Sequence, residues 1–142
     1  MEEKVNEQNQ IILEGSQFKM NWDPAEGVFF IDIWGVLKKE DSQDFKDKFH
    51  EGYTGVISRY GLQGSFKIFV DASGIKSVDH EARRIFTETI TRYTQKTIAA
   101  VYNPSTFVKV VTGFLMAIGR SHVDAKFFTS REEGLKWLKS EK

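Results

Sequence analysis

The most constraining feature of the sequence is an alternation of short apolar runs with segments of helical periodicity. The runs are SQFKMNWD, VFFIDIW, FKIFVDA, TIAAVY and AKFF, and a helical segment follows each from VFFIDIW onward. Short apolar runs bounded by turn residues predict strands. Strands that alternate with helices imply right-handed crossovers and parallel pairing. We therefore expect an α/β fold of order β-β-α-β-α-β-α-β-α, with a mixed, mostly parallel sheet of about five strands and helices packed on it.

Helix capping signals refine this prediction. Either Ser77 or Asp79 is available to cap the helix that follows FKIFVDA. Asn103, directly before Pro104, predicts the start of the next helix, and Ser130 begins a capping box before the last one. Gly61 is placed to end the helix that precedes it. We expect a single domain over residues 11–142, preceded by a flexible polar tail at residues 1–10.

Composition limits the class of protein. The 20 Lys and Arg residues balance the 20 Asp and Glu residues, so no overall field favours nucleic acid. Cysteine is absent, which excludes disulfide and thiolate chemistry. The polar start MEEKVNEQNQ is unlike a signal peptide, and the apolar stretch VVTGFLMAIG is shorter than the roughly 20 residues of a membrane-spanning helix. The expectation is a cytoplasmic protein without membrane insertion or nucleic-acid binding.

The sequence also resembles a known family. Residues 16–138 are similar to the SpoIIAA-like, or STAS/Sec14-like, group of the STAS superfamily of bacterial proteins. The matching segments are GVFFIDIWGVL, FVDASGIKSVDHEARRIF and DAKFFTSREEGLKWL. The resemblance implies a non-catalytic regulatory module without a cofactor. It also implies a protein partner, such as a kinase-like or sensor component.

The resemblance implies a position for a regulatory serine as well. In antagonists of this superfamily a serine at the start of the second helix is phosphorylated, and the added charge controls partner binding. Aligning the preceding strand puts Glu81 at that position, which gives a permanent carboxylate at a helix N-terminus. A competing register places DASG on the motif and makes Ser73 the modified residue. We favour Glu81 because the helical stripe begins near Ala82.

Two binding hypotheses follow from the resemblance. The first is a partner-binding edge after the central strand, formed by Ser73, Ser77, Asp79, His80, Glu81 and Arg84. The alternative is a Sec14-like carrier or sensor of a small apolar or lipid ligand. Its ligand would lie between the sheet and the helix that carries Phe107, Val111 and Phe114. The apolar surface of that helix is equally compatible with a filled core or a homodimer face.

Enzymatic and metal-binding interpretations are weaker. Asp71 and Ser73 lie where an α/β sheet binds ligands, but no sequence signal places a base beside the serine. We therefore interpret DASG as a turn, in which Asp71 ends the strand and Gly74 turns the chain. The three histidines lack the spacing of metal ligands. We expect neither an enzyme nor a metal site.

Overall fold

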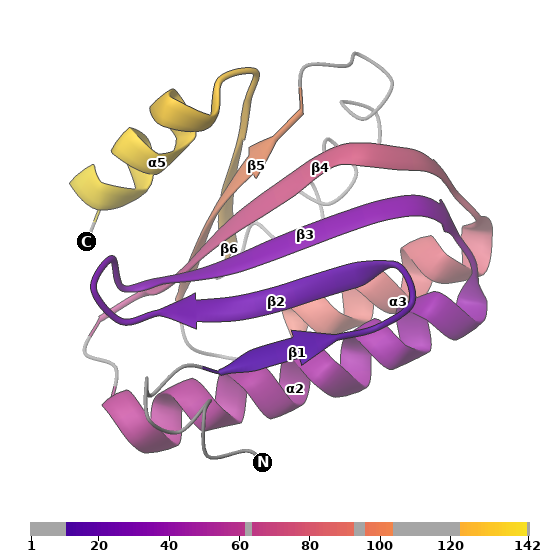
Figure 1. The fold of residues 1–142 in the computed structure, drawn as a ribbon, viewed down its shortest axis with the longest axis horizontal. Coiled ribbons are helices and arrows are strands. Elements are labelled where there is room, and N and C mark those ends of the chain that lie inside the picture. Colours follow the sequence, from indigo (N-terminus) through magenta and orange to yellow (C-terminus); the bar gives the residue numbers. More distant parts are fainter. Residues whose placement is uncertain (1–10, 62–63, 93–95, 104–122, 142) are drawn as a thin grey trace.

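The computed structural model describes residues 11–61, 64–92, 96–103 and 123–141 (Figure 1). Within them, six strands form one sheet in the order β1-β2-β3-β4-β5-β6. The first three pair antiparallel, and β3 to β6 pair parallel. The bounds are β1 Ile12–Glu14, β2 Phe18–Asp23, β3 Val28–Leu37, β4 Phe66–Val78, β5 Thr97–Tyr102 and β6 Val123–Phe128.

Three helices belong to the described residues. They are α2 Lys39–Tyr60, α3 His80–Thr91 and α5 Arg131–Ser140. Asp79 caps α3 by accepting a hydrogen bond from the Ala82 amide at 2.8 Å, which decides between the two predicted caps. Ser130 caps α5 by accepting from the Glu133 amide at 3.3 Å, as predicted. None of these helices is long and apolar enough to cross a membrane.

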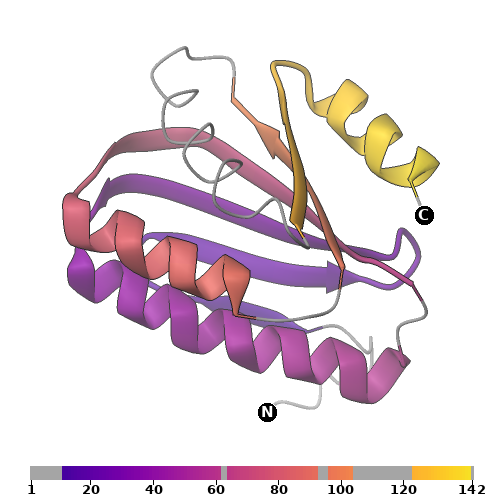
Figure 2. The same ribbon diagram turned by 180° about the vertical axis from the view of Figure 1, so that it is seen from behind.

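The sheet has two differently covered faces. Helices α2 and α3 lie side by side on the inner face, to which Ile31 and Ile33 of β3 point (Figure 2). Helix α5 lies on the outer face, over β4, β5 and β6 (Figure 1). Alternate residues of β3, such as Phe30 and Asp32, belong to that outer face because side chains of a strand alternate in direction. The mixed, mostly parallel α/β sheet expected from the sequence is confirmed.

Aromatic side chains fill one end of the inner face. Phe66, at the start of β4, is fully buried and has Tyr53, Phe29 and Phe49 around it, with ring centroids 5.1, 5.7 and 6.3 Å away. Edge-to-face and tilted pairs at such distances add to the stabilisation from burial. This cluster attaches α2 firmly to the amino-terminal ends of the parallel strands.

The prediction of a turn at DASG is wrong, because β4 continues through it to Val78. Asp71 pairs with Asp32 and Gly74 with Trp34, so β4 carries one extra residue between these pairs, which is a β-bulge. The glycine matters for close approach: a Cβ atom on Gly74 would lie 2.8 Å from the Cβ of Trp34. The long strand β3 continues to pair with β4 here, which overrides the local turn signal.

Candidate functional site

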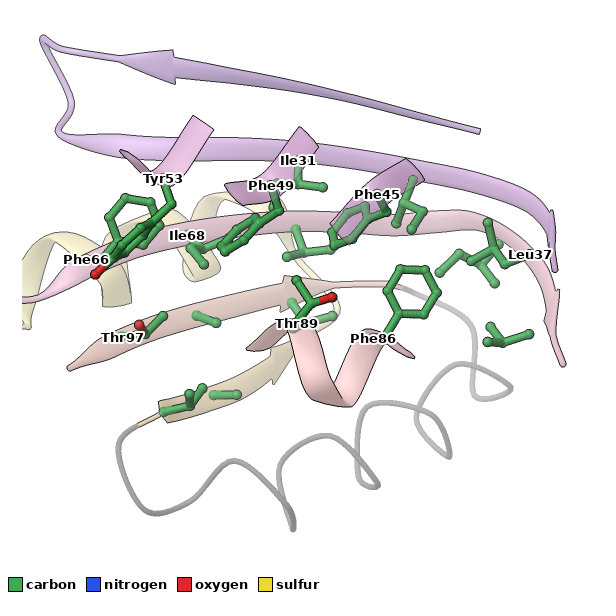
Figure 3. A pocket seen from close by; sticks show the side chains of 18 residues that line it. Ile31, Leu37, Phe45, Phe49, Tyr53, Phe66, Ile68, Phe86, Thr89 and Thr97 are labelled. Carbon is green, nitrogen blue, oxygen red and sulfur yellow. The ribbon is translucent and has the colours of Figure 1, made fainter. Parts of the chain in front are cut away.

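A cavity of about 120 Å³ lies between the inner face of the sheet and the helices α2 and α3 (Figure 3). Strands β3 to β6 form one wall, and side chains such as Phe49 of α2 and Phe86 of α3 form the other. The aromatic cluster around Phe66 closes one end, and Leu37 lies at the other (Figure 3). The cavity therefore runs along the parallel strands, beneath the two helices.

Small side chains on two neighbouring strands explain the space. Ala99 of β5 pairs with Ala125 of β6 and with Ile68 of β4, and all three line the cavity. Inner positions of β3 carry larger groups such as Ile31. The two alanines thus give the wall its smallest side chains, beside the branched Thr97, Val101 and Val123 that line the cavity from the same strands.

The described lining is apolar apart from three hydroxyl-bearing side chains, and it contains no charged residue. The hydroxyl of Thr89 is fully buried and donates to the Ile85 carbonyl at 2.8 Å. Burial raises the pKa of the Tyr53 phenol, which keeps that side chain neutral. Thr97 contributes the third hydroxyl. This chemistry suits an uncharged molecule, because a buried charge without a partner is costly.

An enclosed apolar cavity of this size would cost on the order of 3 kcal/mol if nothing filled it, at ~24 cal/mol per Å³. Native interiors contain few voids larger than a water molecule. An apolar cavity of roughly 150 Å³ in another protein stays dry and binds benzene or xenon. The space is therefore a candidate binding site for a small apolar molecule.

The residues of the predicted partner-binding edge fall into two groups. Asp79, His80, Glu81 and Arg84 are exposed at the start of α3. Arg84 pairs with Glu81 at 2.8 Å and also with another carboxylate of α3 at 2.6 Å. The hydrogen bond between Arg84 and Glu81 lowers the pKa of the Glu81 carboxyl and raises the pKa of the Arg84 guanidinium. The carboxylate in the expected phosphoserine position is thus ionised and already has a cation beside it.

The other two predicted residues lie on β4, Ser73 within the bulge and Ser77 near the end of the strand, close to the Asp79 cap of α3. Ser73 is exposed in the bulge, where its amide and hydroxyl donate to Asp71 at 3.0 and 2.6 Å. Ser77 pairs with Val36 further along the strand. The competing register would need Ser73 at a helix start, but the residue lies inside a strand.

Asp71 connects the bulge to α5. It accepts a hydrogen bond from Arg131 at 2.6 Å, and that guanidinium lies over the rings of Phe69 and Tyr102 at 5.0 and 5.7 Å. Beside it, partial burial raises the pKa of Asp32, and the charge of Asp71 raises it further. The arrangement fixes the start of α5 to the sheet, so we assign Asp71 a structural role.

Asn103 also supports the bulge. Its side chain is fully buried, and Nδ2 donates to the carbonyl of Ala72 at 2.6 Å. The helix predicted to begin at Asn103 lies outside the described residues. The predicted ligand-binding residues Phe107, Val111 and Phe114 lie there too. Within the described part of the chain, no group of three or more histidine or acidic residues could hold a metal ion.

The cavity residues on β5 and β6 were missed in the sequence. A signal did exist, because TIAAVY and DAKFF place alanine at a core-facing position of consecutive strands. Two small residues make a cavity only when the register sets them beside each other. That register is a property of the folded sheet, and periodicity does not reveal it.

The SpoIIAA-like fold expected from the resemblance is confirmed by comparison with solved structures. The chain is similar to the crystal structure of an uncharacterized DUF3478-family protein with a SpoIIAA-like fold from Shewanella loihica. The two are 12% identical, the similarity covers 91% of each chain, and the TM-score is 0.59. At this identity the likeness shows the fold alone.

Two further comparisons concern the sequence. A search of curated proteins found no match. A family model described as a domain of unknown function, DUF7793, matches residues 57–142, which is more than half of the chain. The chain therefore belongs to the DUF7793 family.

Proposed function

We propose that this protein is a non-catalytic module that carries or senses a small apolar molecule in the inner-face cavity. The observation that supports the proposal is the cavity itself, about 120 Å³ in volume with an uncharged lining over the described residues. An apolar molecule in this cavity would bury apolar surface of its own and of the lining, which is favourable. It would also stabilise the folded state, since a ligand that binds the folded chain alone shifts the folding equilibrium.

The first test is native mass spectrometry of the purified protein, followed by titration with benzene as a probe of the cavity. We expect either a bound apolar molecule that is lost on denaturation or an empty cavity that binds benzene and raises the melting temperature. Absence of both results would contradict the proposal. The probe is small because the cavity is comparable with the ~150 Å³ cavity known to accept it.

A variant that fills the cavity makes this test specific. In Ala99→Leu the added carbons occupy the space between β4 and β6, so benzene binding should fall by at least about tenfold, or ~1.4 kcal/mol. The matched control is Ala25→Leu, which makes the same change at an exposed turn residue and should bind like the unchanged protein. Equal binding by both variants would place the probe elsewhere.

A second candidate function is protein binding through the start of α3, the role that the family resemblance implied. The observation in its favour is that Glu81, His80 and Arg84 are exposed there, with Lys39 of α2 close enough to affect the pKa of Glu81. The regulatory role would then use a surface with a constant charge in place of a phosphorylation switch.

This candidate has a matched pair of variants. Glu81 and Glu132 are both exposed and both occupy the second position of a helix. If the start of α3 binds a partner, Glu81→Lys should abolish capture of one identified protein from the native cell, and Glu132→Lys should retain it. Loss in both variants, or in neither, would argue against this surface.

A further inference from the structure

The outer face of the sheet carries apolar side chains that no described residue covers. Among the described residues, three large hydrophobic side chains are exposed, namely Ile12, Trp34 and Val36, with exposed fractions of 42%, 39% and 44%. All three lie on the outer face. Trp34 and Val36 alternate with the inward-facing residues of β3, and Ile12 is in register with Phe30 through Asn21 of β2.

Helix α5 covers a different part of this face. It packs over β4, β5 and β6, whereas Figure 1 shows β1, β2 and the far end of β3 without a described helix in front. Trp34 and Val36 are neighbours on this face of β3, and exposed apolar neighbours mark interaction sites more often than isolated residues do. The outer face of β1 to β3 is therefore a candidate interface.

The charges on this surface suit a second copy of the chain. Lys19 of β2 is directly opposite Asp32 of β3, and both are exposed. Neither forms a salt bridge with another described residue. Residues directly opposite on an antiparallel pair are ~5 Å apart. A cation and an anion side by side form a self-complementary pair, because a two-fold axis between them brings each against its opposite.

We propose that a second copy of this chain docks on the outer face around a two-fold axis between Lys19 and Asp32. Lys19 of each copy then meets Asp32 of the other, and the rings of Trp34 pack in the interface, as in face-to-face sheet packing. This inference is independent of the proposed ligand function, because the cavity lies on the opposite face of the sheet. Because only three large apolar side chains are exposed among the described residues, we expect a weak dimer that exchanges with monomer at micromolar concentrations.

Analytical ultracentrifugation across a concentration series tests the dimer. The unchanged protein should dimerise within about 100 µM, and Trp34→Asp should weaken dimerisation at least about tenfold. The control is Thr54→Asp, an exposed position of α2 on the other side of the molecule, which should leave the affinity unchanged. A protein that stays monomeric through this range would overturn the proposal, whatever else binds to the face.

A charge-exchange experiment tests the two-fold axis. Lys19→Asp and Asp32→Lys should each be monomeric, because each places like charges against each other at both contacts. When they are mixed, position 19 of either variant faces a residue of opposite charge at position 32 of the other. Native mass spectrometry with one variant labelled with ¹⁵N should then detect the heterodimer. If each variant gives a native circular dichroism spectrum and the mixture stays monomeric, the proposed arrangement is wrong.

Discussion

The helices on the two faces of the sheet meet it differently. On the outer face, α5 approaches closely because Gly134 has no side chain, and a Cβ atom there would lie 3.0 Å from the ring of Phe69. Leu138 of the same helix is fully buried. On the inner face, α2 and α3 leave a cavity of about 120 Å³ above Ala99 and Ala125. Both faces bury apolar side chains, so we call the closely packed layer under α5 the dense side and the layer around the cavity the loose side.

The largest expected effect concerns the dense side. Leu138→Ala shortens a fully buried side chain of α5 that packs against the sheet, and it should lower the free energy of unfolding by about 3 kcal/mol. Urea unfolding measures this change. A loss below about 1 kcal/mol would mean that the outer layer relaxes around the missing atoms, and the contrast between the two faces would disappear.

A smaller loss is expected at the bulge in β4. Asn103→Ala leaves the buried carbonyl of Ala72 without this hydrogen bond and should cost about 2 kcal/mol. Asn103→Asp is a useful companion, because a carboxylate cannot donate to that carbonyl and should cost at least as much. A variant as stable as the unchanged protein would show that water replaces the amide.

On the loose side, the sign of the effect should reverse. Ala99→Leu adds carbons where there is space, and we expect the ligand-free protein to gain about 1 kcal/mol in the free energy of unfolding. Overpacking of a filled site would instead destabilise it by about 1–3 kcal/mol. Urea unfolding therefore distinguishes a real void from a well-packed wall.

The smallest effect is electrostatic and belongs to the outer face. Partial burial and Asp71 raise the pKa of Asp32 above its ordinary value, so the folded protein holds the proton more tightly than the unfolded chain. The resulting destabilisation is absent at low pH and develops as the pH rises through both pKa values. Asp32→Asn should therefore stabilise by a few tenths of a kcal/mol at pH 7 and by nothing near pH 3. Thermal unfolding of the monomer at both pH values measures the difference.

The order of the described elements was predictable from the sequence because most strands are apolar runs bounded by turn residues and the helices have capping residues. Asp79 and Ser130 begin helices where the capping rules placed them. Strand β1 was missed, because its three residues are too few to show alternation. The sequence around Ser73 predicts a turn because serine and glycine favour turns. The pairing of β4 with the long strand β3, which the local sequence does not reveal, makes it a bulge instead.

The candidate site was less predictable than the fold. The sequence predicts that an apolar ligand contacts Phe107, Val111 and Phe114, which lie outside the described residues. The walls of the observed cavity include Ala99 and Ala125. Small residues are informative only beside one another, and pairing across β5 and β6 brings these two together. The exposed residues around Glu81 were correctly placed at a helix start, but their role in partner binding stays a prediction.

Methyl-resolved NMR during a benzene titration shows whether a small apolar molecule binds on the inner face. We expect saturable shifts for the methyl groups of Ile31, Ile68 and Ala99 on the inner face, with Val28 and Leu138 on the outer face unchanged. If the chemical shifts of the inner methyl groups do not change, or if those on both faces change equally, benzene does not bind specifically in the inner-face cavity and the proposed function is wrong.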